Sequence, residues 1–148
     1  LRYNTRSQVF AKSLPMPLVE GALKRLEMMR QDPSHRENLW KIARALQEGL
    51  KANGFNIGET NSPVTPVFLN GAVTEATNLT LDLRENFDLF CSIVVYPVVP
   101  KGVIMLRLIP TAVHSMEDVE YTIECFSKIK AKLDNGEYFS EKIVTSQG

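Results

Sequence analysis

The segment VVYPVVPKGVIMLRLIPTAVH, residues 94–114, decides the fold of this 148-residue chain. Two prolines, Pro97 and Pro100, fix the backbone φ angle in a short loop, and Gly102 releases the chain into a second apolar run. Apolar runs on both sides of such a loop predict an antiparallel hairpin, with one strand over residues 90–96 and the returning strand over residues 103–109. The continuous β-branched run of the first strand is typical of a strand that is buried on both faces.

One permanent cation, Arg107, lies in the middle of the returning strand. Alternation places it on the same face as Val103, Met105 and Ile109, and both faces are otherwise apolar, so neither is expected to be freely solvated. Because burying an unpaired charge costs several kcal/mol, Arg107 needs an anion, either a protein carboxylate or a ligand. The planar guanidinium suits a bidentate carboxylate. The residues alone leave a structural ion pair and an exposed strand end open as alternatives.

In the sequence before and after the hairpin, apolar positions at helical spacing predict helices. The first ends near residue 30, the second covers residues 33–52 behind an Asp32 cap, the third covers residues 74–85, and the last opens at Ser115 with Asp118 as an imperfect capping box. A further strand over residues 63–69 holds two prolines, which restrict it to an edge or a bulge. The pattern predicts an α+β domain with about three mainly antiparallel strands packed against helices.

Composition excludes several classes of function. Lys plus Arg and Asp plus Glu both total 17, and the zero formal charge argues against nucleic acid or an anionic membrane as the main partner. No apolar run approaches the roughly 20 residues of a transmembrane helix. The two cysteines, Cys91 and Cys125, are expected to be reduced core thiols of a cytoplasmic protein. We find neither a spacing of metal ligands nor a complete catalytic set.

Several longer strings resemble one enzyme family. YPVVPKG (residues 96–102) followed by LRLIPTAVHSMEDVE (residues 106–120) resembles the C-terminal domain of the α-oxoamine synthases, as do RSQVFAKSLP, RENLWKIARALQEGLKANGF and SPVTPVFL. These enzymes have aminotransferase fold type I, carry pyridoxal 5′-phosphate (PLP) and condense an amino acid with an acyl-CoA. The resemblance covers nearly the whole chain, and it implies the small C-terminal domain of that fold, from a homodimeric enzyme.

The resemblance also implies roles for residues. Arg107 matches the arginine that binds the α-carboxylate of the amino-acid substrate. The loop residues Tyr96, Pro97, Val98, Val99 and Pro100 match a mobile loop that closes over the active site, with Val98 where oxononanoate synthases and several relatives have threonine. His114 matches a family histidine for which we expect only a structural role.

Other parts of the family's active site are expected to precede this chain. They include the lysine that binds PLP as a Schiff base and the acyl-CoA site. We therefore expect no catalytic residue here and an inactive isolated chain. Residues 1–14 are then a segment connecting to a large PLP-binding domain, residues 15–134 the small domain, and residues 135–148 a polar tail.

The implied function is that of a PLP-dependent acyl-CoA:amino-acid C-acyltransferase. YPVVPKG favours a 2-amino-3-ketobutyrate CoA ligase, which uses glycine, whereas RYNTRSQVF and LRLIPTA favour a serine palmitoyltransferase. An 8-amino-7-oxononanoate synthase, and another enzyme of the aminotransferase fold, are further alternatives. A non-catalytic binding or dimerisation module with the same fold is the alternative from another class.

Overall fold

The computed structural model describes residues 4, 6 and 13–139 of the chain. Its contacts divide the chain into two compact units, Leu1–Ser34 and His35–Gly148. The first unit contains helix α2, Met16–Gln31, which begins directly after Pro15 and has no buried residue. The predicted first helix is therefore present, and its large apolar side chains, such as Leu18, Leu26 and Met29, are exposed.

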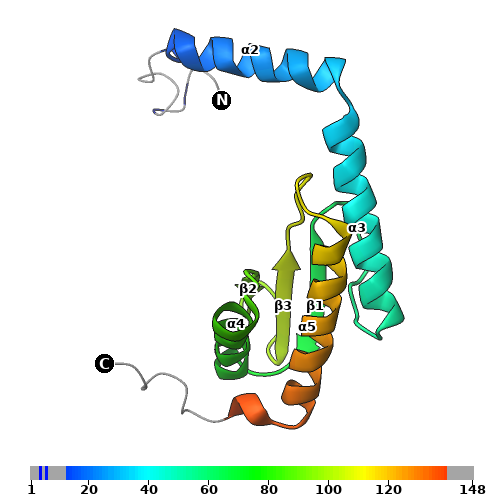
Figure 1. Ribbon diagram of the computed structural model, residues 1–148. Coiled ribbons are helices and arrows are strands. Elements are labelled where there is room, and N and C mark those ends of the chain that lie inside the picture. Colours follow the sequence, from blue (N-terminus) through cyan, green and yellow to red (C-terminus); the bar gives the residue numbers. More distant parts are fainter. Residues whose placement is uncertain (1–3, 5, 7–12, 140–148) are drawn as a thin grey trace. The chain divides into compact units, whose positions relative to one another are not determined.

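The second unit is built on a three-stranded sheet (Figure 1). Its strands are β1, Thr65–Asn70, β2, Ser92–Val94, and β3, Val103–Leu108, in the spatial order β1-β3-β2. Both outer strands pair antiparallel with β3. The predicted α+β fold is confirmed, and the proline-bearing strand β1 lies at an edge as expected.

Strand β2 corrects one prediction. It covers three residues instead of residues 90–96, and all three are only half-buried. Phe90, before the strand, is 81% exposed, and Tyr96, after it, is 55% exposed. A β-branched run was expected to be buried on both faces, but within the described residues β2 is an edge strand that pairs with β3 alone. The β-branched residues predict a strand, but they do not predict which other parts of the protein cover that strand.

Three longer helices complete the second unit: α3, Ser34–Ala52, α4, Val73–Phe87, and α5, Met116–Asp134. The Asp32 carboxylate accepts a hydrogen bond from the backbone N–H of Ser34, which starts α3 where the sequence predicted. The predicted capping box of α5 is also present, since Ser115 and Asp118 each accept the other's backbone N–H. Within the described residues, no helix has the length and hydropathy needed to cross a bilayer.

The core lies between these helices and one face of the sheet (Figure 1). Apolar stripes of α3, α4 and α5 meet the β3 residues Ile104, Leu106 and Leu108, and the β1 residues Val67 and Leu69. Burying this apolar surface is the main stabilising contribution to the domain. The opposite face of the sheet receives no such cover from the described part of this unit, because its residues are half-buried or exposed.

A short 3-10 helix, η1, Glu137–Phe139, follows α5 inside the segment expected to be a polar tail. Its Tyr138 is only 2% exposed, so the chain up to Phe139 belongs to the packed unit. The remainder of residues 135–148 lies outside the described residues, as does most of the expected connecting segment 1–14. The domain boundaries proposed from the sequence stay a prediction.

Candidate functional site

The uncovered face of the sheet carries the candidate site. Register places Arg107 of β3 between Pro66 of β1 and Ser92 of β2. The neighbouring positions on this face are apolar and half-buried: Phe68, Val94, Val103 and Met105. The face is therefore an apolar, partly open surface with one guanidinium near the C-terminal end of its central strand.

Arg107 itself is exposed, which corrects the expectation that it is buried. The predicted alternation is right, since Ile104, Leu106 and Leu108 point into the core and Arg107 points the other way. The error lies in assuming that both apolar faces are covered. The Nε–H of Arg107 donates a 3.0 Å hydrogen bond to the hydroxyl of Ser92.

No internal carboxylate neutralises this guanidinium among the described residues. The ion pairs found there are Lys24–Glu27, Arg84–Glu85, Lys128–Glu124 and Lys132–Asp82. A structural ion pair, one of the alternatives left open by the sequence, is therefore not formed with any described residue. What remains is an exposed strand end or a cation that receives an anionic ligand.

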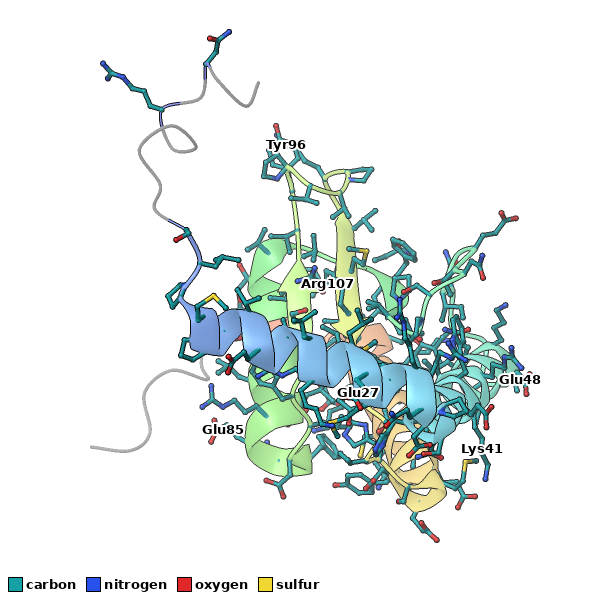
Figure 2. All side chains as sticks on the ribbon, turned by 90° about the horizontal axis from the view of Figure 1, so that it is seen from above. Glu27, Lys41, Glu48, Glu85, Tyr96 and Arg107 are labelled. Carbon is teal, nitrogen blue, oxygen red and sulfur yellow. The ribbon has the colours of Figure 1, made fainter. Side chains whose placement is uncertain are left out.

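The candidate active-site loop lies at the other end of β3. The peptide bond between Tyr96 and Pro97 is cis, and Val98 is 76% exposed. The ammonium group of Lys101 lies 5.2 Å from the centre of the Tyr96 ring. In Figure 2 Tyr96 lies at the tip of the hairpin, and Arg107 lies some way from that tip along β3. Four strand positions, about 13 Å, separate Val103 from Arg107, so this conformation does not bring the loop onto the guanidinium.

The remaining residues of the loop are also exposed or half-buried. Pro97 and Pro100 are exposed and Val99 is half-buried. The backbone N–H of Val98 donates to the carbonyl of Val95, and that of Val103 donates to the carbonyl of Pro100. The loop therefore has a backbone hydrogen bond at each end, and its residues other than Val99 are exposed.

Two groups near the site have structural roles. Burial raises the pKa of the Cys91 thiol to about 11, so this neighbour of Ser92 is neutral at physiological pH. The Nδ1 of His114 accepts a 3.1 Å hydrogen bond from the backbone N–H of Thr111, which matches the structural role expected for this histidine. Both cysteines are free and buried, as predicted.

A hollow of about 330 Å³ lies at the end of the sheet beyond Arg107. Core residues such as Leu46 and Leu108 form part of its wall, and Asp88, His114 and Asp118 also line it. Arg107 does not line this hollow, so the hollow is separate from the guanidinium.

The described residues do not by themselves form a site for PLP. Such a site needs a lysine amine that can reach the cofactor's carbonyl carbon, inside a pocket that excludes water. Each described lysine is either exposed or already engaged, Lys130 with the Gly54 carbonyl and Lys132 with Asp82. In the described residues, no group of three His, Cys, Asp or Glu side chains could hold a metal ion.

Sequence reasoning missed Ser92, the partner of Arg107. The signal was present, because positions 92 and 107 lie equally far from the centre of the loop at residues 99 and 100. Counting outward from the centre of an antiparallel hairpin pairs these two positions, which the observed register confirms. Ser92 is also the only hydroxyl in the run FCSIVV.

Comparison with known proteins relates this fold to acyltransferases. A cysteate-C-fatty acyltransferase from Capnocytophaga ochracea is 59% identical over 138 residues, which cover 93% of this chain and 33% of that protein. A serine palmitoyltransferase from Sphingobacterium spiritivorum is 32% identical, covering 84% of this chain and 31% of that protein. An 8-amino-7-oxononanoate synthase from Symbiobacterium thermophilum is also 32% identical, covering 90% and 33% of the two chains. No protein-family model matches the chain.

Comparison with solved structures finds enzymes of the same kind. The serine palmitoyltransferase of Sphingomonas wittichii superposes with a TM-score of 0.75 at 29% identity, covering 88% of this chain and 33% of that chain. A serine palmitoyltransferase solved with PLP gives a TM-score of 0.78 at 27% identity, covering 90% and 33%. The chain thus spans about a third of the length of the proteins that it matches.

These relatives are PLP-dependent acyltransferases, and the part of them that this chain matches is a small α+β domain at their C-terminus. The chain belongs to the α-oxoamine synthase family and corresponds to the C-terminal region of its members. The family resemblance of the hairpin strings is thereby confirmed.

Proposed function

We propose that this chain is the part of a PLP-dependent C-acyltransferase that holds the amino-acid carboxylate, in an enzyme that joins a fatty acyl group to cysteate. The observation that carries the proposal is Arg107, a guanidinium on an otherwise apolar sheet face that forms no ion pair with a described residue. A planar fork of N–H donors binds a carboxylate at two points and so fixes its orientation.

Arg107 would act by binding and orienting the substrate. Two parallel hydrogen bonds to the α-carboxylate limit the rotation of the amino acid about the bond between its α and carboxyl carbons. Held in this way, the α carbon approaches the acyl carbonyl in one geometry, which lowers the entropic part of the barrier. The cofactor chemistry, which stabilises negative charge at that carbon, is assigned to the part of the enzyme that this chain does not cover.

The choice of cysteate rests on identity and not on Arg107. Glycine, serine and cysteate all present an α-carboxylate, so the guanidinium treats them alike. The chain shares 59% identity with a cysteate-C-fatty acyltransferase and 32% with a serine palmitoyltransferase. These relatives give no support to the glycine-using 2-amino-3-ketobutyrate CoA ligase that YPVVPKG favoured. A homodimer in the cytoplasm stays a prediction.

Closure of the loop from Tyr96 to Pro100 over the substrate is a further part of the proposal. Its exposed apolar side chains, Val98 above all, offer surface that could cover a bound substrate and exclude water. In the observed conformation the loop lies away from Arg107, so closure requires either a movement of the hairpin or a loop from a second subunit.

The proposal is tested by assaying the complete enzyme, loaded with PLP, against a matrix of substrates. Cysteate, serine and glycine are each combined with acetyl-CoA and palmitoyl-CoA, and the products are identified by mass spectrometry. We expect the highest kcat/KM for cysteate with palmitoyl-CoA. A preference for glycine with acetyl-CoA would restore the earlier alternative.

Absence of transfer by the complete loaded protein with every pair would instead favour the non-catalytic module. The 148-residue chain alone is expected to be inactive in the same assay.

A further inference from the structure

The contact between Ser92 and Arg107 carries an inference that goes beyond the proposed function, although it rests on it. The two residues are direct cross-strand partners, and such partners have Cβ atoms about 4.5–5.5 Å apart on the same face of a sheet. The partner of Arg107 on the other side is Pro66, whose ring can neither donate nor accept a hydrogen bond. Ser92 is therefore the cross-strand neighbour that can hold the guanidinium.

The hydrogen bond uses one particular donor of the five that a guanidinium carries. Ser92 Oγ accepts from Nε at 3.0 Å, and Nε lies at the base of the fork. A carboxylate can approach a guanidinium from the side, through Nε and one Nη, or end-on, through both Nη groups. With Nε already donated to Ser92, the side approach loses one of its two donors, and the end-on approach keeps both.

We propose that Ser92 is a positioning residue, whose hydroxyl fixes the plane of the Arg107 guanidinium and presents its two Nη groups end-on to the substrate carboxylate. The apolar neighbours on the same face, including Val94 and Met105, provide no alternative acceptor. Without Ser92 the guanidinium remains charged but is free to rotate about its side-chain bonds. The orientation of the guanidinium would then be fixed only when the substrate binds, and the entropy lost would weaken binding.

Steady-state kinetics of the complete, PLP-loaded enzyme tests this role. We expect Ser92→Ala to raise KM for the amino acid about tenfold, the effect of losing one hydrogen bond to a charged group, and to leave KM for acyl-CoA unchanged and kcat within about twofold. Ser92→Thr keeps the hydroxyl and a β-branched shape suited to a strand, so it should restore a KM near that of the wild type.

A matched control is Ser127→Ala, which removes another half-buried hydroxyl, one that donates to the Ile123 carbonyl within α5. This variant should leave both KM values unchanged. An unchanged amino-acid KM in Ser92→Ala, or equal losses in Ser92→Ala and Ser92→Thr, would overturn the positioning role. A general loss of kcat with no change in KM would also overturn it.

A second readout separates this inference from the proposed function. In protein labelled with ¹⁵N-arginine, the hydrogen bond predicts an Arg107 Nε–H signal that exchanges slowly with water in the wild type and in Ser92→Thr, and rapidly in Ser92→Ala. If the wild type transfers no acyl group to any amino acid, the proposed function fails, and the exchange rates alone decide whether Ser92 orders the guanidinium. Equal exchange in wild type and Ser92→Ala would reject it.

Discussion

The hydroxyl of Tyr138 donates a 2.6 Å hydrogen bond to the carboxylate of Asp82, which joins η1 to α4. The same carboxylate accepts hydrogen bonds from Lys132 at 2.7 Å and from Asn86 at 2.6 Å. Asp82 is only 7% exposed, so these three donors replace the water that burial removes. One carboxylate thus links α4, α5 and η1 beside the core, away from the sheet face that carries Arg107.

The contacts of Asp82 predict that the free energy of unfolding depends on pH. Burial raises the pKa of Asp82, but the hydrogen bonds from Lys132, Tyr138 and Asn86 more than offset this and hold it below its ordinary value. A folded pKa below the unfolded one gives stability that is fully present above the unfolded pKa, about 4, and is lost as pH falls through the folded pKa. We expect Asp82→Asn to lower the free energy of unfolding by about 2–3 kcal/mol at pH 7.

Urea unfolding between pH 3 and pH 7, followed by circular dichroism, measures this difference, which should shrink below pH 4 or so. The control is Asp134→Asn, an exposed aspartate near the end of α5, for which we expect a change below about 0.5 kcal/mol at each pH. A loss in Asp82→Asn that does not vary with pH would show that the ionised charge of Asp82 does not account for its role.

A feature could be predicted from the sequence where the residues that form it lie close together in the chain, and could not where they lie far apart. The capping box of Ser115 and Asp118 and the Asp32 cap were predictable because both partners lie within three residues. The pairing of Asp82 with Tyr138 spans 56 positions, and nothing in the sequence around Asp82 distinguishes it from a solvated helix carboxylate. The exposure of Arg107 was missed for a similar reason. Alternation along a strand separates two faces, but only the three-dimensional packing decides which face is covered.

The Cys91 thiol provides a prediction about reactivity. Burial raises its pKa to about 11, so only about 0.1% is thiolate at pH 8, and the sulfur is also inaccessible. We expect iodoacetamide at pH 8 to leave Cys91 unmodified in the native protein over a time that fully alkylates it in urea. Peptide mass spectrometry after timed quenching measures the modification. Rapid native alkylation of Cys91 would mean that the short strand β2 opens readily.

Gly102, at the end of the hairpin loop, has a backbone conformation that favours glycine, and this predicts the effect of replacing it. Its φ of +83° lies in the left-handed region, and no atom lies within 4 Å of where a Cβ would be placed. The cost of Gly102→Ala is therefore backbone strain, about 1–2 kcal/mol in the free energy of unfolding. Gly102→Asn should lose less, since asparagine tolerates this region better. Urea unfolding compares the two variants, and equal stability of wild type and Gly102→Ala would contradict the assigned conformation.

Arg107 gives the prediction that bears most directly on function. In the complete enzyme, we expect Arg107→Ala to weaken amino-acid binding by about 2–5 kcal/mol, because the substrate carboxylate loses its paired charge when it leaves water. Arg107→Lys keeps the charge but replaces the planar fork with a single ammonium group, so its amino-acid KM should lie between those of the wild type and Arg107→Ala. KM for acyl-CoA should change in neither variant.

Guanidinium ions added to the assay should partly restore amino-acid binding in Arg107→Ala and have no such effect on the wild type, since a free ion can occupy the vacated position. Arg84→Ala serves as the control, because Arg84 lies exposed on α4 beside Glu85. An unchanged amino-acid KM in Arg107→Ala would mean that another cation binds the carboxylate. Arg107 would then be an exposed residue at the end of a strand, the alternative that its exposure in this structure leaves in place.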